Sequence, residues 1–198
     1  GIKAAEELAI KYGYKPIVYY TNGYHIYIID QLGYRPRRVF QFHSIEELEL
    51  LKLRGTMRQD ITAPKIDSNI AGRKYQEEAI TAACNAFAHN RRHALLVMAT
   101  GTGKTRVSIA LVDILMKANW AKNVLFLADR TSLIRQAHKN FNKLLPNATT
   151  SIYSGGSVNR DANARIIFST YQTMINLIND DTREFGIGRF DLIIVDEA

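Results

Sequence analysis

The residues from Met98 to Thr105, Met-Ala-Thr-Gly-Thr-Gly-Lys-Thr, have the types and spacing needed to hold a polyphosphate. Gly101 and Gly103 allow the backbone to turn with its N–H groups facing inward, so that phosphate oxygens would meet several donors at the start of a helix. Lys104 would supply a positive charge for the outer phosphates, and Thr105 would supply a hydroxyl for magnesium. The predicted nucleotide-binding residues are therefore Thr100, Gly101, Thr102, Gly103, Lys104 and Thr105.

The flanks of this loop favour the same interpretation. The apolar run 94–97 predicts a buried strand over 93–98, and residues 107–116 repeat apolar residues at helical spacing. Strand, glycine loop and helix is the context of a phosphate loop. The first glycine of the general pattern G-x-x-x-x-G-K-[ST] would fall on Met98, so the match is to the shorter form A-T-G-T-G-K-T. An ordinary glycine turn before a helix is the alternative, and the flanks disfavour it.

An acidic pair follows the last apolar run of the chain. Residues 191–198, Asp-Leu-Ile-Ile-Val-Asp-Glu-Ala, predict a strand that delivers Asp196 and Glu197 at its C-terminal end, where open α/β sheets place their ligands. Asp196 could hold magnesium, and Glu197 could polarise the water that attacks a γ-phosphate. A surface acidic pair is the alternative, which the phosphate loop upstream weakens. The candidate catalytic residues are Lys104, Asp196 and Glu197, and the candidate magnesium ligands are Thr105 and Asp196.

Apolar strands alternate with helices in the rest of the chain after residue 72. This order predicts an α/β fold with a parallel sheet covered by helices on both faces. The predicted strands are 93–98, 123–128, 149–153, 165–169 and 191–195. The predicted helices are 73–89, a segment from the loop to 118, 131–145 and 171–179.

The N-terminal part predicts a smaller α+β segment. A helix over 3–12 ends at Gly13, and two β-rich runs flank Asn22-Gly23, the strongest short signal for a β-hairpin. A third run covers 37–42, and Ser44-Ile45-Glu46-Glu47 predicts a capping box that opens a helix to residue 53. In residues 54–72 the apolar residues do not recur at a regular spacing, which predicts a linker.

Composition sets broad limits on the kind of protein. A hydrophobic content of 46% indicates a globular chain, and a net charge of +7 with a pI near 9.5 is compatible with a polyanionic partner. The single cysteine, Cys84, cannot form an internal disulfide, and no Cys/His group has zinc spacing. No leader-like or membrane-spanning apolar run is present, so we expect a cytoplasmic protein without a membrane partner. The abrupt end after an apolar strand indicates a fragment.

The motifs resemble those of superfamily 2 helicases and translocases. The loop A-T-G-T-G-K-T is similar to their motif I, and Asp196-Glu197-Ala198 resembles the start of their D-E-A-H or D-E-A-D box. Arg73-Lys74-Tyr75-Gln76 resembles the segment whose glutamine reads the adenine edge, since an amide can pair with both a donor and an acceptor. The resemblance implies ATP and Mg²⁺ as cofactors. A solvated glutamine on an amphipathic helix is the alternative for Gln76.

Two further stretches resemble nucleic-acid motifs of the same superfamily. Residues 127–136 are similar to motif Ia, in which a helix N-terminus meets the nucleic-acid backbone, and Thr131 and Ser132 are suitable caps for that helix. Residues 169–173, Ser-Thr-Tyr-Gln-Thr, resemble the next such motif. Ordinary capped helices are the alternative for both stretches. The residues implied in nucleic-acid binding are Arg130, Thr131, Ser132 and Thr170.

Within the superfamily, A-D-R-T-S-L-I-R-Q, S-T-Y-Q-T and the start of D-E-A-H are similar to the motor subunit of type I restriction enzymes. Residues 17–24 and 35–38 resemble the segment that closes the nuclease domain of those subunits. The family's preceding Q-x-x-x-Y pattern is not met, because Ala4 and Leu8 occupy those positions, and no nuclease catalytic residue is assigned. The implied regions are a nuclease-like tail over 1–53, a linker over 54–72 and the first RecA-like helicase lobe over 73–198, which stops at motif II.

The resemblance implies a DNA translocase within a type I site-specific deoxyribonuclease, in which ATP hydrolysis drives movement of duplex DNA before cleavage. The implied partners are double-stranded DNA and the methylation and specificity subunits of the restriction complex. One lobe alone is expected to be almost inactive, because phosphoryl transfer usually needs an arginine from across the cleft. Two alternatives stay open: another superfamily 2 DNA or RNA helicase, and a phosphate-loop ATPase that does not bind nucleic acid.

Overall fold

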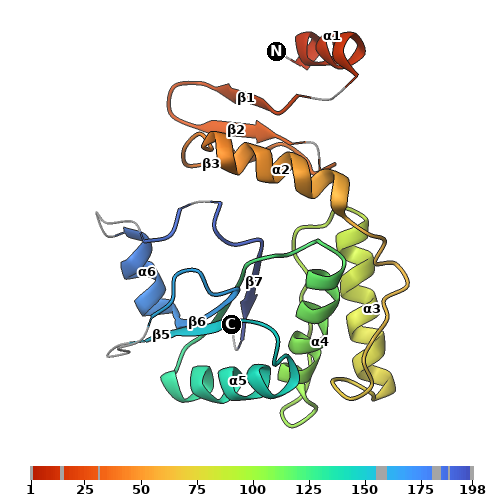
Figure 1. Cartoon of the computed structure of the whole chain (residues 1–198), viewed down its shortest axis with the longest axis vertical. Coiled ribbons are helices and arrows are strands. Elements are labelled where there is room, and N and C mark those ends of the chain that lie inside the picture. The colour runs from red at the N-terminus through yellow and green to blue at the C-terminus, as the bar shows by residue number, and fades with distance from the viewer. Residues whose placement is uncertain are drawn as a thin grey trace. The chain divides into compact units, whose positions relative to one another are not determined.

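The computed structural model describes residues 2–13, 16–30, 32–154, 160–179, 184–186 and 188–196 (Figure 1). The chain forms two compact units. The first combines Gly1–Arg58 with Ala86–Ala94, and the second combines Gln59–Asn85 with Leu95–Ala198. Within the part of the chain that the structure describes, no helix has the length and apolar content to cross a membrane.

The first unit contains an antiparallel sheet with the strand order β1-β2-β3. The hairpin predicted around Asn22 and Gly23 is confirmed: the Asn22 side chain accepts the N–H groups of Tyr24 and His25, and Gly23 has a φ of 90°. The capping box is also present, because the Ser44 and Glu47 side chains accept each other's backbone N–H groups. The elements are α1 (Ile2–Tyr12), β1 (Val18–Thr21), β2 (Ile26–Ile29), β3 (Arg37–Val39) and α2 (Ile45–Met57).

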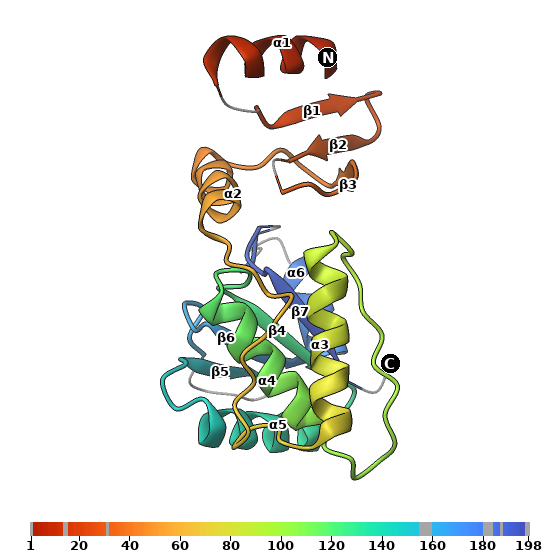
Figure 2. The same ribbon diagram turned by 90° about the vertical axis from the view of Figure 1, so that its right-hand side faces the viewer.

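The second unit contains a parallel sheet with the strand order β5-β6-β4-β7 (Figure 2). Helix α3, which begins in this unit, runs beside α4, and the N-terminal ends of the two helices lie together in Figures 1 and 2. The elements are α3 (Lys74–Ala88), α4 (Lys104–Lys117), β4 (Val124–Ala128), α5 (Thr131–Leu144), β5 (Thr150–Tyr153), β6 (Ile166–Thr170), α6 (Tyr171–Asn179) and β7 (Leu192–Val195).

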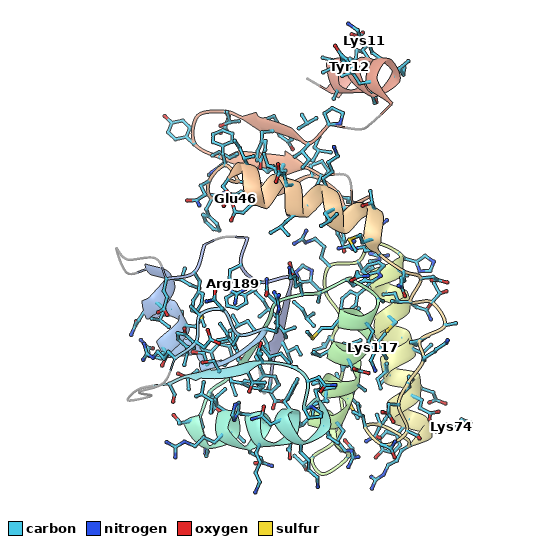
Figure 3. All side chains as sticks on the ribbon, in the orientation of Figure 1. Lys11, Tyr12, Glu46, Lys74, Lys117 and Arg189 are labelled. Atoms are coloured by element: carbon cyan, nitrogen blue, oxygen red, sulfur yellow. The ribbon has the colours of Figure 1, made fainter. Side chains whose placement is uncertain are left out.

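The two faces of this sheet are covered by different helices. Phe126 and Phe168 point to one face and pack against Phe141 of α5, with ring centroids 5.7 Å and 5.1 Å from the Phe141 ring. Their neighbours Leu125 and Ile167 point to the other face and share an apolar cluster with Met174 of α6. Because side chains alternate along a strand, the central strands β4 and β6 are buried on both sides, and side chains fill the space between the sheet and α5 in Figure 3. The predicted parallel sheet with helices on both faces is confirmed.

The strand predicted over 93–98 is not formed. The segment follows an extended path outside the four-stranded sheet, and the Leu95 and Val97 side chains are 87% and 88% exposed. An apolar run predicts burial, but a strand also needs a hydrogen-bonding neighbour, which the composition of the run does not specify. Edge strand β7 has two exposed side chains of its own, Ile193 and Val195.

The segment between the two predicted domains contains buried residues. Ile61 and Ile70 are almost fully buried, and the Gln59 backbone makes two hydrogen bonds within the second unit. Its N–H donates to the carbonyl of Ala118 at 2.9 Å, and its carbonyl accepts the Trp120 indole N–H at 2.7 Å. These contacts hold the segment that precedes α3 against the C-terminal end of α4.

We expect Phe168→Ala to lower the free energy of unfolding of the second unit by about 3–5 kcal/mol, because it empties a fully buried ring site between β4 and α5. Urea unfolding followed by the fluorescence of Trp120, the one tryptophan of the chain, measures this. The matched control is Phe40→Ala, at an exposed ring, with an expected loss below about 1 kcal/mol. Equal losses would contradict the assignment of Phe168 to the core.

Candidate nucleotide site

The predicted phosphate loop has the backbone that its glycines were expected to provide. Gly101 and Gly103 both adopt left-handed conformations, with φ values of 79° and 92°. Gly103 is the N-cap residue of α4, and no side chain caps this helix. Thr102 turns back on the loop, with its hydroxyl donating to the Ala99 carbonyl at 2.6 Å. The helix therefore begins at Lys104 with an N-terminus that suits an anion.

Helix α3 holds the loop through two side chains. Gln76 donates from Nε2 to the Thr102 carbonyl at 2.9 Å, and the Tyr75 hydroxyl donates to the same carbonyl at 2.9 Å. The Gln76 side-chain oxygen accepts the Arg73 N–H at 3.4 Å. Gln76 is only 3% exposed, so the alternative of a solvated glutamine is wrong. An amide has two N–H groups and two lone pairs, so Gln76 keeps the capacity for one further bond of each kind.

Gly103 lies directly against the Gln76 amide. A Cβ built on Gly103 would be 2.6 Å from Gln76 Nε2, whereas a Cβ on Gly101 would have no heavy atom within 4 Å. The two glycines thus have different tasks. Gly101 only provides the left-handed turn, while Gly103 also leaves room for the amide that holds the loop.

Arg106 also stabilises the site, through hydrogen bonds to the segment before α3, and this role was not predicted from the sequence. Its Nε donates to the Ile70 carbonyl at 2.6 Å, and its Nη2 donates to the Asn69 carbonyl. These carbonyls belong to a turn in which the Asp67 carbonyl accepts the N–H groups of Ile70 and Ala71. The first turns of α4 and the entry to α3 are thereby joined. Backbone carbonyls carry no sequence signal, so no motif points to this role.

The acidic residue predicted after the last strand lies at the carboxyl end of the sheet. The Asp196 N–H donates to the Leu127 carbonyl at 2.9 Å, which places Asp196 beside the end of β4. Glu197 lies outside the described residues. Within the described part of the chain, the buried Tyr171 hydroxyl has no hydrogen-bond partner; burial raises its pKa, and Asp196 and Asp129 raise it further. Asp196, Asp129 and Tyr171 thus gather at one edge, a grouping that sequence analysis did not find.

The predicted nucleic-acid residues also follow the carboxyl ends of strands. Arg130 is the N-cap of α5; its side chain is 77% exposed and lies 3.3 Å from the Asp129 carboxylate. The prediction that Thr131 and Ser132 cap this helix is wrong, because Arg130 has the extended backbone of a cap and Thr131 is already helical. Thr170 does cap α6, since its hydroxyl accepts the Thr173 N–H at 3.3 Å.

The donor set of the site fits a magnesium–triphosphate. Lys104 and Thr105, the first residues of α4, are both half-buried, so their side chains are reached from solvent. Magnesium in such sites needs only one or two protein oxygens beside phosphate oxygens, and a hydroxyl at 105 with a carboxylate at 196 is of that kind. Across the described ranges, no group of three His, Cys, Asp or Glu side chains could hold a metal by itself.

Parallel strands, a glycine loop that opens a helix, and a carboxylate at a strand end define a RecA-like, phosphate-loop class of domain. The family model described as "Type III restriction enzyme, res subunit" matches residues 69–198. The chain belongs to this family.

Within this family, the chain is similar to endonuclease subunits of type I restriction enzymes. The chain is 35% identical over 136 residues to the type I restriction enzyme EcoKI endonuclease subunit of Escherichia coli K12, and 35% identical over 128 residues to the EcoAI endonuclease subunit of Escherichia coli. These matches cover 66% and 64% of the chain, which spans 12% and 15% of the two relatives.

A solved structure gives the same relationship. It is a fragment described as an HsdR subunit of a type I restriction enzyme from Vibrio vulnificus YJ016, with a TM-score of 0.52 and 27% identity. The match covers 100% of the chain and 36% of the solved one. The predicted resemblance to type I motor subunits is confirmed.

We expect Gly103→Ala to destabilise the second unit more than Gly101→Ala. Each alanine forces a left-handed backbone at about 1–2 kcal/mol, and at 103 the Gln76 amide must also leave Thr102, at about 1 kcal/mol more. In a Gln76→Ala background the two glycine variants should cost the same. Urea unfolding of the six proteins measures this. A difference that persists without the amide would mean that Gln76 does not hold the loop.

Proposed function

We propose that the chain contains the ATP-binding lobe of a restriction subunit that moves duplex DNA, with ATP hydrolysis driving movement before cleavage. The observation that carries the proposal is the phosphate loop at the start of α4, fixed through Thr102 by a buried glutamine of α3. The similarity to type I endonuclease subunits favours this role over other superfamily 2 helicases. In this proposal, regions 1–53, 54–72 and 73–198 are nuclease-like tail, linker and motor lobe.

We assign the chemistry to four side chains. Lys104 neutralises the outer phosphates, and Thr105 and Asp196 hold magnesium, which supplies charge neutralisation on the phosphate oxygens when bound. Glu197 orients the attacking water. The loop residues Thr100 to Gly103 present backbone N–H groups to the phosphates.

Gln76 reads adenine in this proposal through the amide N–H and lone pair that its bonds to Thr102 and Arg73 leave over. Gln76→Ala should then lower the affinity for ATP more than that for GTP. An ATP-to-GTP affinity ratio that stays unchanged would contradict the adenine role and leave Gln76 as a support of the loop.

The DNA contacts of the proposal lie at the carboxyl end of the sheet. Arg130, Thr131 and Ser132 at the start of α5, with Thr170 at the start of α6, would contact backbone phosphates. The Thr170 hydroxyl also donates to Thr173 Oγ1 at 2.9 Å, so in this proposal a phosphate would take the place of Thr173 Oγ1 as the acceptor of that proton. Double-stranded DNA and the methylation and specificity subunits are the proposed partners, and the cytoplasm is the proposed location.

A phosphate-loop ATPase without a nucleic-acid partner is the other candidate. A filter-binding assay of the chain against duplex DNA separates the two, because that candidate predicts no retention of DNA at low salt. The chain alone should hydrolyse little ATP in our proposal, since an arginine from a second lobe typically contributes a factor of about a thousand or more.

We expect Arg130→Ala to weaken binding to any duplex alike and to reduce the slope of log affinity against log salt by about one unit, because one phosphate contact and its released counterion are lost. Fluorescence anisotropy over a salt series measures both quantities. Lys143→Ala is the matched control, since Lys143 is an exposed cation in the last turn of the same helix. An unchanged slope, or a loss confined to one sequence, would contradict the role of Arg130.

A further inference from the structure

In the first unit, two arginines lie against the ring of one tyrosine, and the charge of a third arginine acts on one of them. Tyr34 lies between β2 and β3, and the guanidinium carbons of Arg92 and Arg58 lie 5.1 Å and 5.6 Å from its ring centroid. Arg58 also donates from Nη1 to the Tyr34 hydroxyl at 3.4 Å. Arg37, at the start of β3, is the third arginine. We call these four residues the Tyr34 cluster.

The Tyr34 cluster has an excess of positive charge. The buried Asp30 carboxylate accepts from Arg37 Nη1 and from the Leu32 N–H, so both of its oxygens are engaged. Burial lowers the pKa of Arg92, and the charges of Arg37 and Arg58 lower it further, while Tyr34 and Asp30 act in the opposite direction. At Arg92, the two like charges of Arg37 and Arg58 therefore act against the single carboxylate of Asp30, and this field favours an anion.

Gly33 lets the segment that carries Tyr34 approach the segment that carries Arg92. Gly33 has a φ of 79°, and a Cβ built there would be 3.0 Å from the Asn90 side-chain nitrogen. A side chain at position 33 would press on the segment that carries Arg92. The glycine therefore permits both the turn before Tyr34 and the close approach of residue 90.

We propose that the Tyr34 cluster binds a phosphate group, and that this group belongs to the backbone of duplex DNA. A guanidinium stacked on a ring keeps the N–H groups of its edge available for the oxygens of a phosphate, which its fork matches. Arg92 is exposed, whereas Arg37 and Arg58 are half-buried, so Arg92 is the arginine of the cluster that is open to a phosphate from solvent. The choice of DNA over a free phosphate rests on the proposed function.

Two variants of Arg92 test the site in the 198-residue chain. Arg92→Ala should weaken binding to duplex DNA about tenfold and reduce the salt slope by about one unit, because a charge-assisted contact is lost. Arg92→Lys should retain the slope and lose part of the affinity, because a lysine keeps the charge without the fork. If Arg92→Ala lowers the melting temperature, the DNA affinity and salt slope of Arg92→Lys test whether position 92 contacts a phosphate.

Arg91→Ala is the matched control, since Arg91 is the adjacent exposed arginine. Equal losses for the Arg91 and Arg92 variants would overturn the proposal in favour of diffuse surface charge, and unchanged DNA binding in both Arg92 variants would overturn it outright. If wild type bound no duplex, the proposal and the proposed function would both fail. ³¹P line broadening of inorganic phosphate distinguishes the sources: phosphate binding that depends on Arg92, with DNA binding unchanged, would mean a small-anion site and contradict the DNA occupant.

Discussion

The hydrogen bond from the buried Gln76 amide to the Thr102 carbonyl is the contact on which the nucleotide site depends. Two residues of the loop are glycines in left-handed conformations, and they have no side chains that could stabilise the loop. The Gln76 amide, which extends from α3, holds the loop through this bond. A buried polar group without its partner is costly, so Gln76 and the loop stabilise each other's position. Arg106 extends this constraint to the turn before α3.

The sheet contributes a second constraint, since its carboxyl edge collects polar residues from three parallel strands. Asp129 follows β4, Thr170 ends β6 and Asp196 follows β7. The central strands β4 and β6 are held in place by apolar side chains on both faces, which pack against α5 on one side and α6 on the other, and β7 pairs with β4. The buried Tyr171 hydroxyl has no hydrogen-bond partner among the described residues, feels the charges of Asp129 and Asp196, and has no role in the proposed function.

Local patterns predicted what depends on local geometry. The Asn22-Gly23 hairpin, the Ser44 capping box and the apolar strands were readable because turn chemistry and two-residue alternation act within a few residues. The run 94–97 shows the limit, since its apolar character did not reveal that it would lie outside the sheet. Arg106 and the Tyr34 cluster depend on contacts between distant segments, with backbone carbonyls or the face of a ring as partners, and these leave no spacing pattern in a sequence.

The central claim is that the loop before α4 holds the phosphates of a nucleotide. Isothermal titration of ATP with Mg²⁺ into the 198-residue chain and into its Lys104→Ala variant tests it most directly. The account predicts measurable binding by the wild-type chain and a loss of about tenfold or more in the variant, because a charge-assisted contact to phosphate disappears while α4 keeps a good helix former. Equal affinities in the two proteins would contradict it.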